Sequence, residues 1–503
     1  MPLSSRHRNV PSASSFHRRA VDRVPTEILA IVFAAASLPD PSIHWDRRIQ
    51  GMLAALAVSQ VCRRWRQIAC AAPHLWKNIT IAIPFTTGKR SLVRMSLARS
   101  ATAHLDINID VRNPDYVDDS DVPLCEPDEM RECLEDILPH AQRWGNLDVI
   151  CDTLPVMRAF LEKTKDVSPR QLARIALMRP NPMFSAYGTD PERDELESDP
   201  LFSGPLPRLE EVVLHGTHVD WTSPALHDLT HLEFRYQTEY VMPSWECFAA
   251  LVRSSPHLHS LVLCGWGPDF DDVDTCRASS VKTLVFPALA SFSFGYVDVE
   301  SAQKLLSLVS MPHLQSLSIE DADNLYGPGN ERCDSTPLIA QMSAHIAPRS
   351  APFDLAKIIF LELVTVHAEQ GAFARLFAGL LALDELSLVK MHPNIFSALK
   401  PLDIPALGQT LRPCAKLRRI QCRSMDASSL VGIVQTRAIA AAEGVACPPR
   451  VRALTLRNCS PLADLDSWML QKFGVDIVVE RYEDGPPDMN VSDDDDDDSD
   501  EDL

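Results

Sequence analysis

The chain has 503 residues, a formal net charge of −20 and a hydrophobic content of 46%. This length is too great for one compact core, so we expect two or more structural units or an array of repeats. The acidity disfavours nucleic acid as a partner, and no apolar run approaches the roughly 20 residues that a membrane-spanning helix needs. The thirteen cysteines are scattered, odd in number and without a C-x-x-C pair. They predict reduced thiols, no metal site and no cofactor, in the cytoplasm, the nucleus or both.

Residues 1–20 are rich in Ser and Arg and contain no acidic residue. A mitochondrial presequence has a similar composition, but it needs an amphipathic helix, which Pro2 and Pro11 would break. We therefore expect a disordered basic arm.

Residues 24–79 predict three short helices. Pro25 suits the first turn of a helix, and apolar residues follow it at helical spacing. A second apolar helix is expected over residues 49–59, running into a third that Pro73 ends. One face of that third helix is predicted to carry Val58, Val61, Cys62, Trp65, Ile68 and Ala69. Three helices in about 55 residues cannot bury all their apolar surface alone, which indicates a docking module.

Three submotifs carry a family resemblance in this stretch. They are Val-Pro-x-Glu-Ile-Leu-x-x-Val-Phe (24–33), Val-Cys-Arg-x-Trp-Arg-x-Ile-Ala (61–69) and Pro-x-Leu-Trp-x-x-Ile (73–79). Together they resemble an F-box, and the last is most similar to the F-box-like proteins of mushroom-forming fungi. Val24 stands where Leu is usual, and a Pro-bearing insert (38–48) lengthens the first loop.

The resemblance implies a substrate-recognition adaptor of a cullin–RING (SCF-type) ubiquitin ligase, which docks on a Skp-type adaptor and holds a protein target. Carried over by position, the implied docking residues are Pro25, Ile28, Leu29, Phe33, Val61, Cys62 and Trp65. Trp65 and Trp76 also suit the module's own core.

The residues after the module alternate strand and helix signals. Ile79 to Ile83 form a β-branched run, residues 89–100 are helical, and residues 105–111 alternate apolar and polar side chains as a half-buried strand does. The resemblance extends to this segment, since the fungal F-box proteins begin their substrate domain in a similar way.

One pattern, apolar-x-x-apolar-x-apolar, then recurs eleven times at uneven spacing, which is typical of a leucine-rich repeat with a strand at each copy. The copies are residues 144–149, 172–177, 209–214, 229–234, 258–263, 289–294, 314–319, 358–363, 383–388, 417–422 and 451–456. Helices are expected between them, for example over residues 245–253, 300–309, 371–381 and 427–442. Three Pro-, Gly- or acid-rich loops, residues 113–128, 180–207 and 321–352, are expected to protrude or to be disordered. The predicted fold class is α/β: a three-helix F-box followed by an irregular solenoid, a horseshoe with a parallel sheet.

The residues that flank the inward positions of each copy are expected to face solvent. Examples are Glu211, Val213 and His215 on one copy and Ser260, Val262 and Cys264 on another. Arg419, Arg423 and Arg457 form a basic patch near the end of this face and are candidate partner contacts. The alternative, simple solvation of a sheet face, fits most of the set.

Nine of the last twelve residues, 492–503, are Asp or Glu, and without them the formal charge would be −11. Like-charge repulsion predicts a disordered tail, so the expected domains are 1–20, 21–82, 83–480 and 481–503. Ser492 and Ser499 each have an acidic residue three positions on and fit an acidophilic-kinase pattern, but the run is better explained as a solubilising tail.

No catalytic motif stands out. Lys89 lacks the upstream glycine of a phosphate-binding loop, and His227 and His231 flank a predicted strand, where their spacing does not suit one metal. The sequence therefore favours an adaptor, not an enzyme. A repeat scaffold whose helical bundle packs only on its own solenoid is the rival interpretation. Exposed apolar residues on the first and third helices would separate the two.

Overall fold

The computed structural model describes residues 24–37, 49–113, 125–179, 200–270, 283–323, 333–343, 352–400, 402–404, 409–411, 413–426, 428–442, 451–460, 464–472 and 474–480. The expected basic arm, the 38–48 insert, most of the three expected loops and the acidic tail lie outside these residues. The chain divides into two compact units, Met1–Leu289 and Ala290–Leu503, and each is described by itself.

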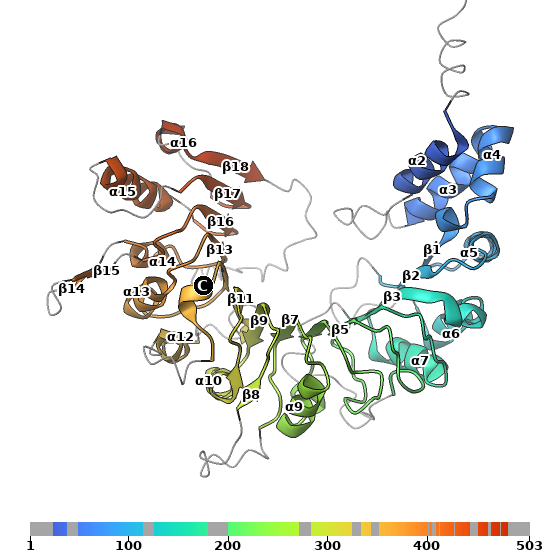
Figure 1. The fold of residues 1–503 in the computed structure, drawn as a ribbon, viewed down its shortest axis with the longest axis horizontal. Helices are drawn as coiled ribbons and strands as arrows, with labels where there is room; N and C mark the ends of the chain where they lie inside the picture. The colour runs from blue at the N-terminus through green and yellow to red at the C-terminus, as the bar shows by residue number, and fades with distance from the viewer. Residues whose placement is uncertain are drawn as a thin grey trace, which may run out of the picture. The chain divides into compact units, whose positions relative to one another are not determined.

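The first unit begins with short helices, as the sequence predicts (Figure 1). Pro25 caps the first of them, and Glu27 lies in its first turn, near the positive end of the helix dipole. The elements are α2 (Thr26–Ala36), α3 (Ile49–Val61), α4 (Arg63–Cys70) and the 3₁₀ helix η2 (Pro73–Trp76).

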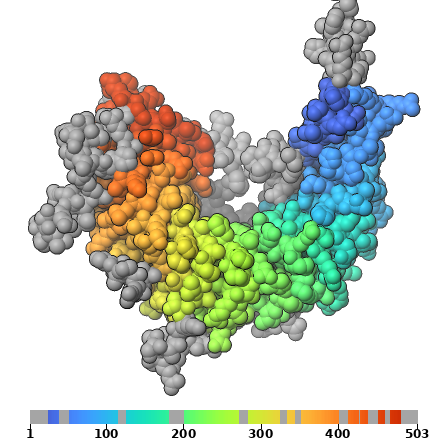
Figure 2. Space-filling view, in the orientation of Figure 1, coloured from blue at the N-terminus to red at the C-terminus, as the bar shows by residue number. Residues whose placement is uncertain are grey.

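These helices lead into a parallel sheet in which seven strands lie in chain order. The strands are β1 (Asn78–Ala82), β2 (Leu105–Asp110), β3 (Trp144–Ile150), β4 (Arg174–Met178), β5 (Glu211–His215), β6 (His231–Arg235) and β7 (Ser260–Cys264). The connections contain α5 (Thr87–Arg99), α6 (Pro127–Glu135), η3 (Leu138–Arg143), α7 (Leu154–Thr164), η5 (Glu239–Val241), α9 (Trp245–Arg253) and the short strand β8 (Leu284–Val285). In the space-filling view the N-terminal helices and the first strands, blue to cyan, form one continuous surface (Figure 2).

The second unit repeats the arrangement, with seven parallel strands in chain order. They are β9 (Ser291–Tyr296), β11 (Ser316–Asp321), β12 (Phe360–Val364), β13 (Glu385–Val389), β16 (Arg419–Arg423), β17 (Ala453–Arg457) and β18 (Asp476–Glu480). Its helices are α10 (Val299–Leu308), α12 (Thr336–Ser343), η7 (Leu355–Lys357), α13 (Gln370–Gly379), α14 (Ile395–Ala398), α15 (Leu430–Ala442) and α16 (Asp464–Lys472). Three short strands complete it: β10 (Val309–Ser310), β14 (Leu402–Ile404) and β15 (Gln409–Leu411). The helices α10, α12, α13 and α14 pack on one another in sequence, on one side of the strands (Figure 1).

Each of the eleven predicted copies lies on a strand, and the α/β class with a large parallel sheet is confirmed. The period-two alternation explains the match: Leu232 and Phe234 of β6 are buried, while His231, Glu233 and Arg235 are part exposed. The expectation of solvent-facing residues was wrong for Val213, Val262 and Cys264, which are buried. In the register Glu233 lies between Val213 and Val262, so short apolar residues on that face have a longer polar side chain beside them. The strand β18 has no counterpart among the predicted copies.

Six of the strands are followed directly by a residue whose backbone has a positive, left-handed φ angle. Its N–H donates to the carbonyl oxygen of the last residue of the next strand, at 2.7 to 3.2 Å. The φ angles of these residues lie between 49° and 55°. The residues are Gly216, Tyr236, Thr365, Lys390, Ser424 and Asn458. Positive φ turns the chain out of the sheet without losing this last ladder bond. Each repeat is thereby tied to its successor within its own unit.

Candidate functional site

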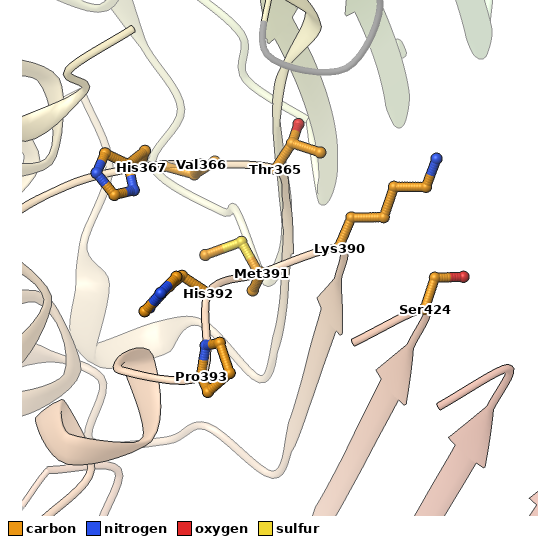
Figure 3. A pocket seen from close by; sticks show the side chains of 8 residues that line it. All are labelled: Thr365, Val366, His367, Lys390, Met391, His392, Pro393 and Ser424. Atoms are coloured by element: carbon orange, nitrogen blue, oxygen red, sulfur yellow. The ribbon is translucent and has the colours of Figure 1, made fainter. Parts of the chain in front are cut away.

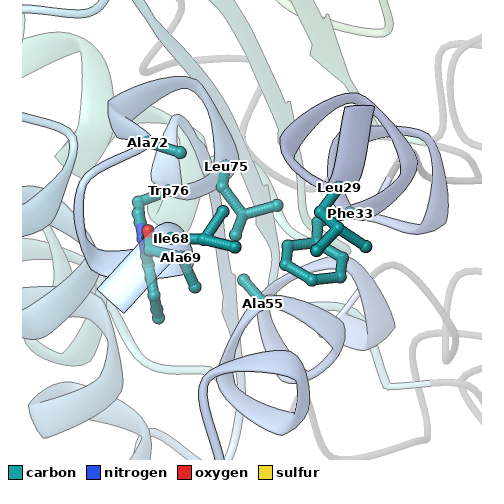
Figure 4. Packing of buried hydrophobic residues seen from close by; sticks show 8 residues of the cluster. All are labelled: Leu29, Phe33, Ala55, Ile68, Ala69, Ala72, Leu75 and Trp76. Carbon is teal, nitrogen blue, oxygen red and sulfur yellow. The ribbon is translucent and has the colours of Figure 1, made fainter. Parts of the chain in front are cut away.

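The helical module at the start of the chain has its own hydrophobic core (Figure 4). Side chains from α2, α3, α4 and η2 meet there, and Phe33 packs on Trp65 with ring centroids 4.7 Å apart. The buried residues are Leu29, Phe33, Ala55, Ile68, Ala69, Ala72, Leu75 and Trp76. Phe33 and Trp76 are the largest of them, and aromatic side chains bury a large area each.

Hydrogen bonds to backbone oxygens hold the helices in place. The indole Nε1 of Trp76 donates to Ala69 O at 2.8 Å, which satisfies the polar end of a side chain that is 1% exposed. Arg64 donates to Val24 O at 2.6 Å and so joins α4 to the start of α2. The guanidinium of Arg99 lies 4.4 Å from the Trp76 ring centroid, which ties α5 to the module.

The predicted third helix is broken, contrary to the sequence expectation. Cys62 has extended backbone angles, φ −158° and ψ 170°, and caps α4 by accepting a hydrogen bond from Trp65 N at 3.4 Å. Val58 and Val61 therefore belong to α3, and Arg66 crosses the junction by donating to Ser59 O at 3.0 Å. The apolar spacing in the sequence suggested one helix, because the single non-helical residue between α3 and α4 leaves the apolar residues at nearly helical intervals.

A set of large apolar side chains lies on the outside of the module. On α2, Ile28 is 48% exposed, Ile31 64% and Val32 53%; on α3, Leu53 is 46% and Val61 61% exposed. Their spacing of three, four or eight residues places them along one side of each helix. Exposed apolar residues at helical spacing are typical of a surface that binds a partner.

The residues predicted to dock therefore fall into two groups. Pro25, Ile28, Val61 and Cys62 are exposed, whereas Leu29 and Phe33 are 5% and 2% exposed and belong to the core. Trp65 is half-buried against Phe33. Ile31 and Leu53 were not among the predicted residues; the i+3 spacing from Ile28 was the signal that could have identified Ile31.

The module also packs on the sheet that follows it. Helix α3 contacts β1, where Met52, 3% exposed, accepts a hydrogen bond at its sulfur from Thr80 N at 2.9 Å. Leu53 and Val61 of the same helix remain 46% and 61% exposed. The exposed apolar residues are thus left uncovered by the described residues of the same unit.

The three candidate arginines lie on adjacent strands of the second unit, where the register pairs Arg423 with Arg457. Arg419 contacts Asp384 and Glu385, each at 2.9 Å, and Arg457 contacts Glu480 at 2.7 Å. Arg423 is exposed. The predicted basic patch is therefore largely neutralised by carboxylates on neighbouring strands.

The side chains of His227 and His231 contact different carboxylates. His227 contacts Asp228 at 3.1 Å, and His231 contacts Glu233 at 3.4 Å. Burial would raise the pKa of Glu233, but hydrogen bonds from His215, His231 and Arg235 outweigh it and hold that pKa well below its usual range. Among the described residues no group of three His, Cys, Asp or Glu side chains could hold a metal ion.

The buried thiols are poor nucleophiles. Burial raises the pKa of Cys133, Cys151 and Cys414 to about 12, so these thiols stay protonated at neutral pH.

Comparison with known proteins places the module in a family. Residues 21–82 match the F-box-like family model. No curated protein matches the chain. In the part of the chain that the structure describes, no helix combines the length and the apolarity that crossing a membrane requires. An F-box-like domain suggests in general the role of an SCF-type ubiquitin ligase adaptor that binds a Skp-type protein, and such proteins are typically not enzymes.

Proposed function

We propose that this chain is a substrate-recognition adaptor of a cullin–RING ubiquitin ligase. Residues 21–82 bind a Skp-type adaptor, and residues 83–480 bind a protein target, in the cytoplasm, the nucleus or both. The observation that carries the proposal is the combination of a complete internal core with exposed Ile28, Ile31, Val32 and Val61 in a stretch that matches the F-box-like model.

The docking surface is formed by the exposed members of the predicted set, Pro25, Ile28, Val61 and Cys62. Leu29, Phe33 and Trp65 support it from below by fixing α2 against α4. Large apolar anchors at the centre of an interface typically cost about 2 kcal/mol or more when truncated. Core residues affect docking only through the fold of the module.

The target-binding domain is a leucine-rich-repeat-like solenoid in this proposal. The regular parallel register and the left-handed turn that recurs after six of the described strands support it, since repeats of this kind contact only their neighbours. Arg423, which is exposed between β13 and β17, is the best placed of the three candidate arginines for a target; Arg419 and Arg457 serve first to hold carboxylates.

The mechanism is proximity and requires no catalytic group on this chain. A target held by the repeat domain is brought near a ubiquitin-charged enzyme, which raises its effective concentration there. The buried, protonated thiols agree with a role in binding.

A repeat scaffold without a ligase role is the second candidate, favoured by the contact of α3 with β1 through Met52 and Thr80. In that case the module would serve only to cover one end of the first sheet.

The experiment is binding of the purified full-length chain to a Skp-type adaptor, measured by calorimetry. Ile28→Asp should weaken binding about 30-fold or more while circular dichroism stays unchanged. Ile359→Asp, which alters an isoleucine that is 43% exposed in the second unit, is the matched control and should bind as the wild type does. Leu29→Ala should lower the thermal stability first, by emptying a core position.

Binding that Ile28→Asp abolishes and Ile359→Asp preserves would establish the docking surface. A folded wild-type chain that does not bind would reject the adaptor role and favour the scaffold.

A further inference from the structure

A groove lies at one edge of the second unit's sheet, where three neighbouring parallel strands end (Figure 3). It consists of two adjoining cavities with volumes of about 350 and 250 Å³, which share Val366, His367, Met391 and His392. The residues come from the segments that directly follow β12, β13 and β16. Buried Val366, Met391, Phe373 and Ile395 form its apolar floor.

The polar groups around this floor are hydrogen-bond donors. Lys390 is exposed and carries an ammonium group, and Ser424 contributes a hydroxyl. His392 Nδ1 accepts a hydrogen bond from Asn394 N at 3.3 Å, so its hydrogen is on Nε2 and available to a ligand. An ammonium group and an imidazole N–H suit an acidic ligand.

These donors are spread along the groove. Figure 3 shows Lys390 and Ser424 pointing past the strand ends on one side, with His367 and His392 beside Met391 and Pro393 on the other. An extended segment with several carboxylates can follow donors that are spread in this way.

Two cations lie on one side of the groove although the chain is acidic. Lys390 follows β13 and Arg423 ends β16, so the parallel register places them at the same edge. In the described part of the chain neither of them forms an ion pair. Glu480 contacts Arg457 at 2.7 Å, and Asp426 accepts from Ser428 N at 2.9 Å. The carboxylates on the His367 side of the groove are exposed Glu369 and Asp334, so an acidic ligand would meet its cations at Lys390 and Arg423.

The chain carries a segment of matching chemistry that starts at this edge. Strand β18 ends at Glu480, and in a parallel sheet its end lies on the same side as the ends of β13, β16 and β17. Neighbouring strands are about 4.8 Å apart, so β13 lies about 14 Å from β18 across the sheet. Thirteen residues lead from Glu480 to Asp493, and that length can span up to about 43 Å.

We propose that the groove binds the chain's own acidic C-terminal segment, residues 492–503. The six consecutive aspartates 493–498 provide carboxylates at short intervals for Lys390, His392 and Arg423. The bound segment covers the strand ends of the repeat domain and competes there with acidic segments of other proteins. This inference does not depend on the adaptor role.

The test uses a labelled peptide of residues 492–503 and the full-length chain, with fluorescence anisotropy as the readout. In one variant the nine acidic residues of the tail are replaced by Asn or Gln. This tail-neutralised chain should bind the peptide. The wild type should bind it at least about tenfold more weakly, because its attached tail competes at an effective concentration in the millimolar range. High salt should weaken the binding.

Charge reversals locate the site. In the tail-neutralised chain, Lys390→Glu should weaken binding about tenfold or more. Lys416→Glu is the matched control, because Lys416 is exposed just before β16, at the opposite edge of the same sheet, and it should bind as its parent does. Circular dichroism checks the fold of each variant.

Three results would overturn the proposal. The first is failure of the tail-neutralised chain to bind the peptide. The second is an equal loss in Lys390→Glu and Lys416→Glu, which would indicate diffuse charge attraction. The third is equal binding by wild-type and tail-neutralised chains, which would assign the groove to an acidic partner and not to the tail.

Discussion

A Cβ atom built on Gly51 would lie 2.8 Å from the carbonyl oxygen of Ser37, so α3 approaches the end of α2 too closely for any side chain. Gly51 is buried in the first turn of α3, and Ser37 caps α2 with its hydroxyl donating to Phe33 O at 2.8 Å. The position of α2, and with it that of Ile28, depends on this contact.

Gly51→Ala should therefore destabilise the helical module by about 1–3 kcal/mol, since the clash is with backbone that cannot rotate away. Thermal unfolding followed by circular dichroism measures this. Gly88→Ala is the control: Gly88 is exposed in α5, and its Cβ would meet only Thr86 Oγ1 at 3.9 Å. That substitution should stabilise α5 by about 0.5–1 kcal/mol. Equal effects of the two substitutions would contradict the close packing of α2 and α3.

The cap at Cys62 gives a second prediction. Serine is a better N-cap than cysteine, so Cys62→Ser should keep or raise the stability of α4, whereas Cys62→Ala should lower it by about 1 kcal/mol. Denaturant unfolding of the two variants compares them directly. If alanine and serine behave alike, the Cys62 Sγ to Trp65 N contact contributes nothing.

The residues with positive φ after the strands give a third prediction. Ser424 has φ 51°, a conformation that is unfavourable for residues other than glycine. Ser424→Gly should raise the stability of the second unit by about 0.5–1 kcal/mol. Ser316→Gly, in strand β11, is the matched control and should lower it, because glycine there only adds freedom to the unfolded chain. Thermal unfolding of the full chain distinguishes the two signs.

His218 gives a pH dependence. Burial, helped by the charges of Arg179 and Arg158, lowers the pKa of His218 to about 3. The unfolded chain binds a proton near pH 6.5 that the folded chain excludes, so this contribution to stability is full above that pH and declines as the pH falls toward 3. The slope should reach about 1.4 kcal/mol per pH unit. In His218→Gln the denaturation midpoint should change less over this window; an unchanged slope would mean that His218 takes up its proton in the folded state.

Repetition explains how much of the fold could be predicted from the sequence. Pairs such as Leu232 and Phe234 alternate with polar neighbours, and eleven copies of the pattern predict a strand at each one. The turns after the strands could not be predicted in the same way. Thr365, Lys390 and Ser424 adopt positive φ without the Gly or Asn that usually signals it, because the hydrogen bond to the next strand imposes the conformation.

The sequence predicted the region that contains the candidate docking site, but not which of its side chains face outward. Ile28 and Leu29 are adjacent apolar residues, and the sequence does not say which of them faces inward. The positions of Ala55 and Ile68, which come from other helices, decide that Leu29 is the buried one. The break at Cys62 was missed because a cap by a thiol leaves no strong sequence signal. Strand β18 was missed because its consecutive valines, Val478 and Val479, do not alternate with polar residues.

Those two valines are 49% and 58% exposed on β18, the last strand in the order of its sheet. An outer strand of this kind offers unpaired backbone groups to a second molecule and invites fibre-like association. Here the chain leads from that strand, after twelve further residues, to nine carboxylates within residues 493–502. Two molecules that approached each other along β18 would bring these like charges together and repel. The position of the acidic residues after the last strand therefore keeps the protein dispersed in dilute buffer, and added salt, which screens the charges, weakens this effect.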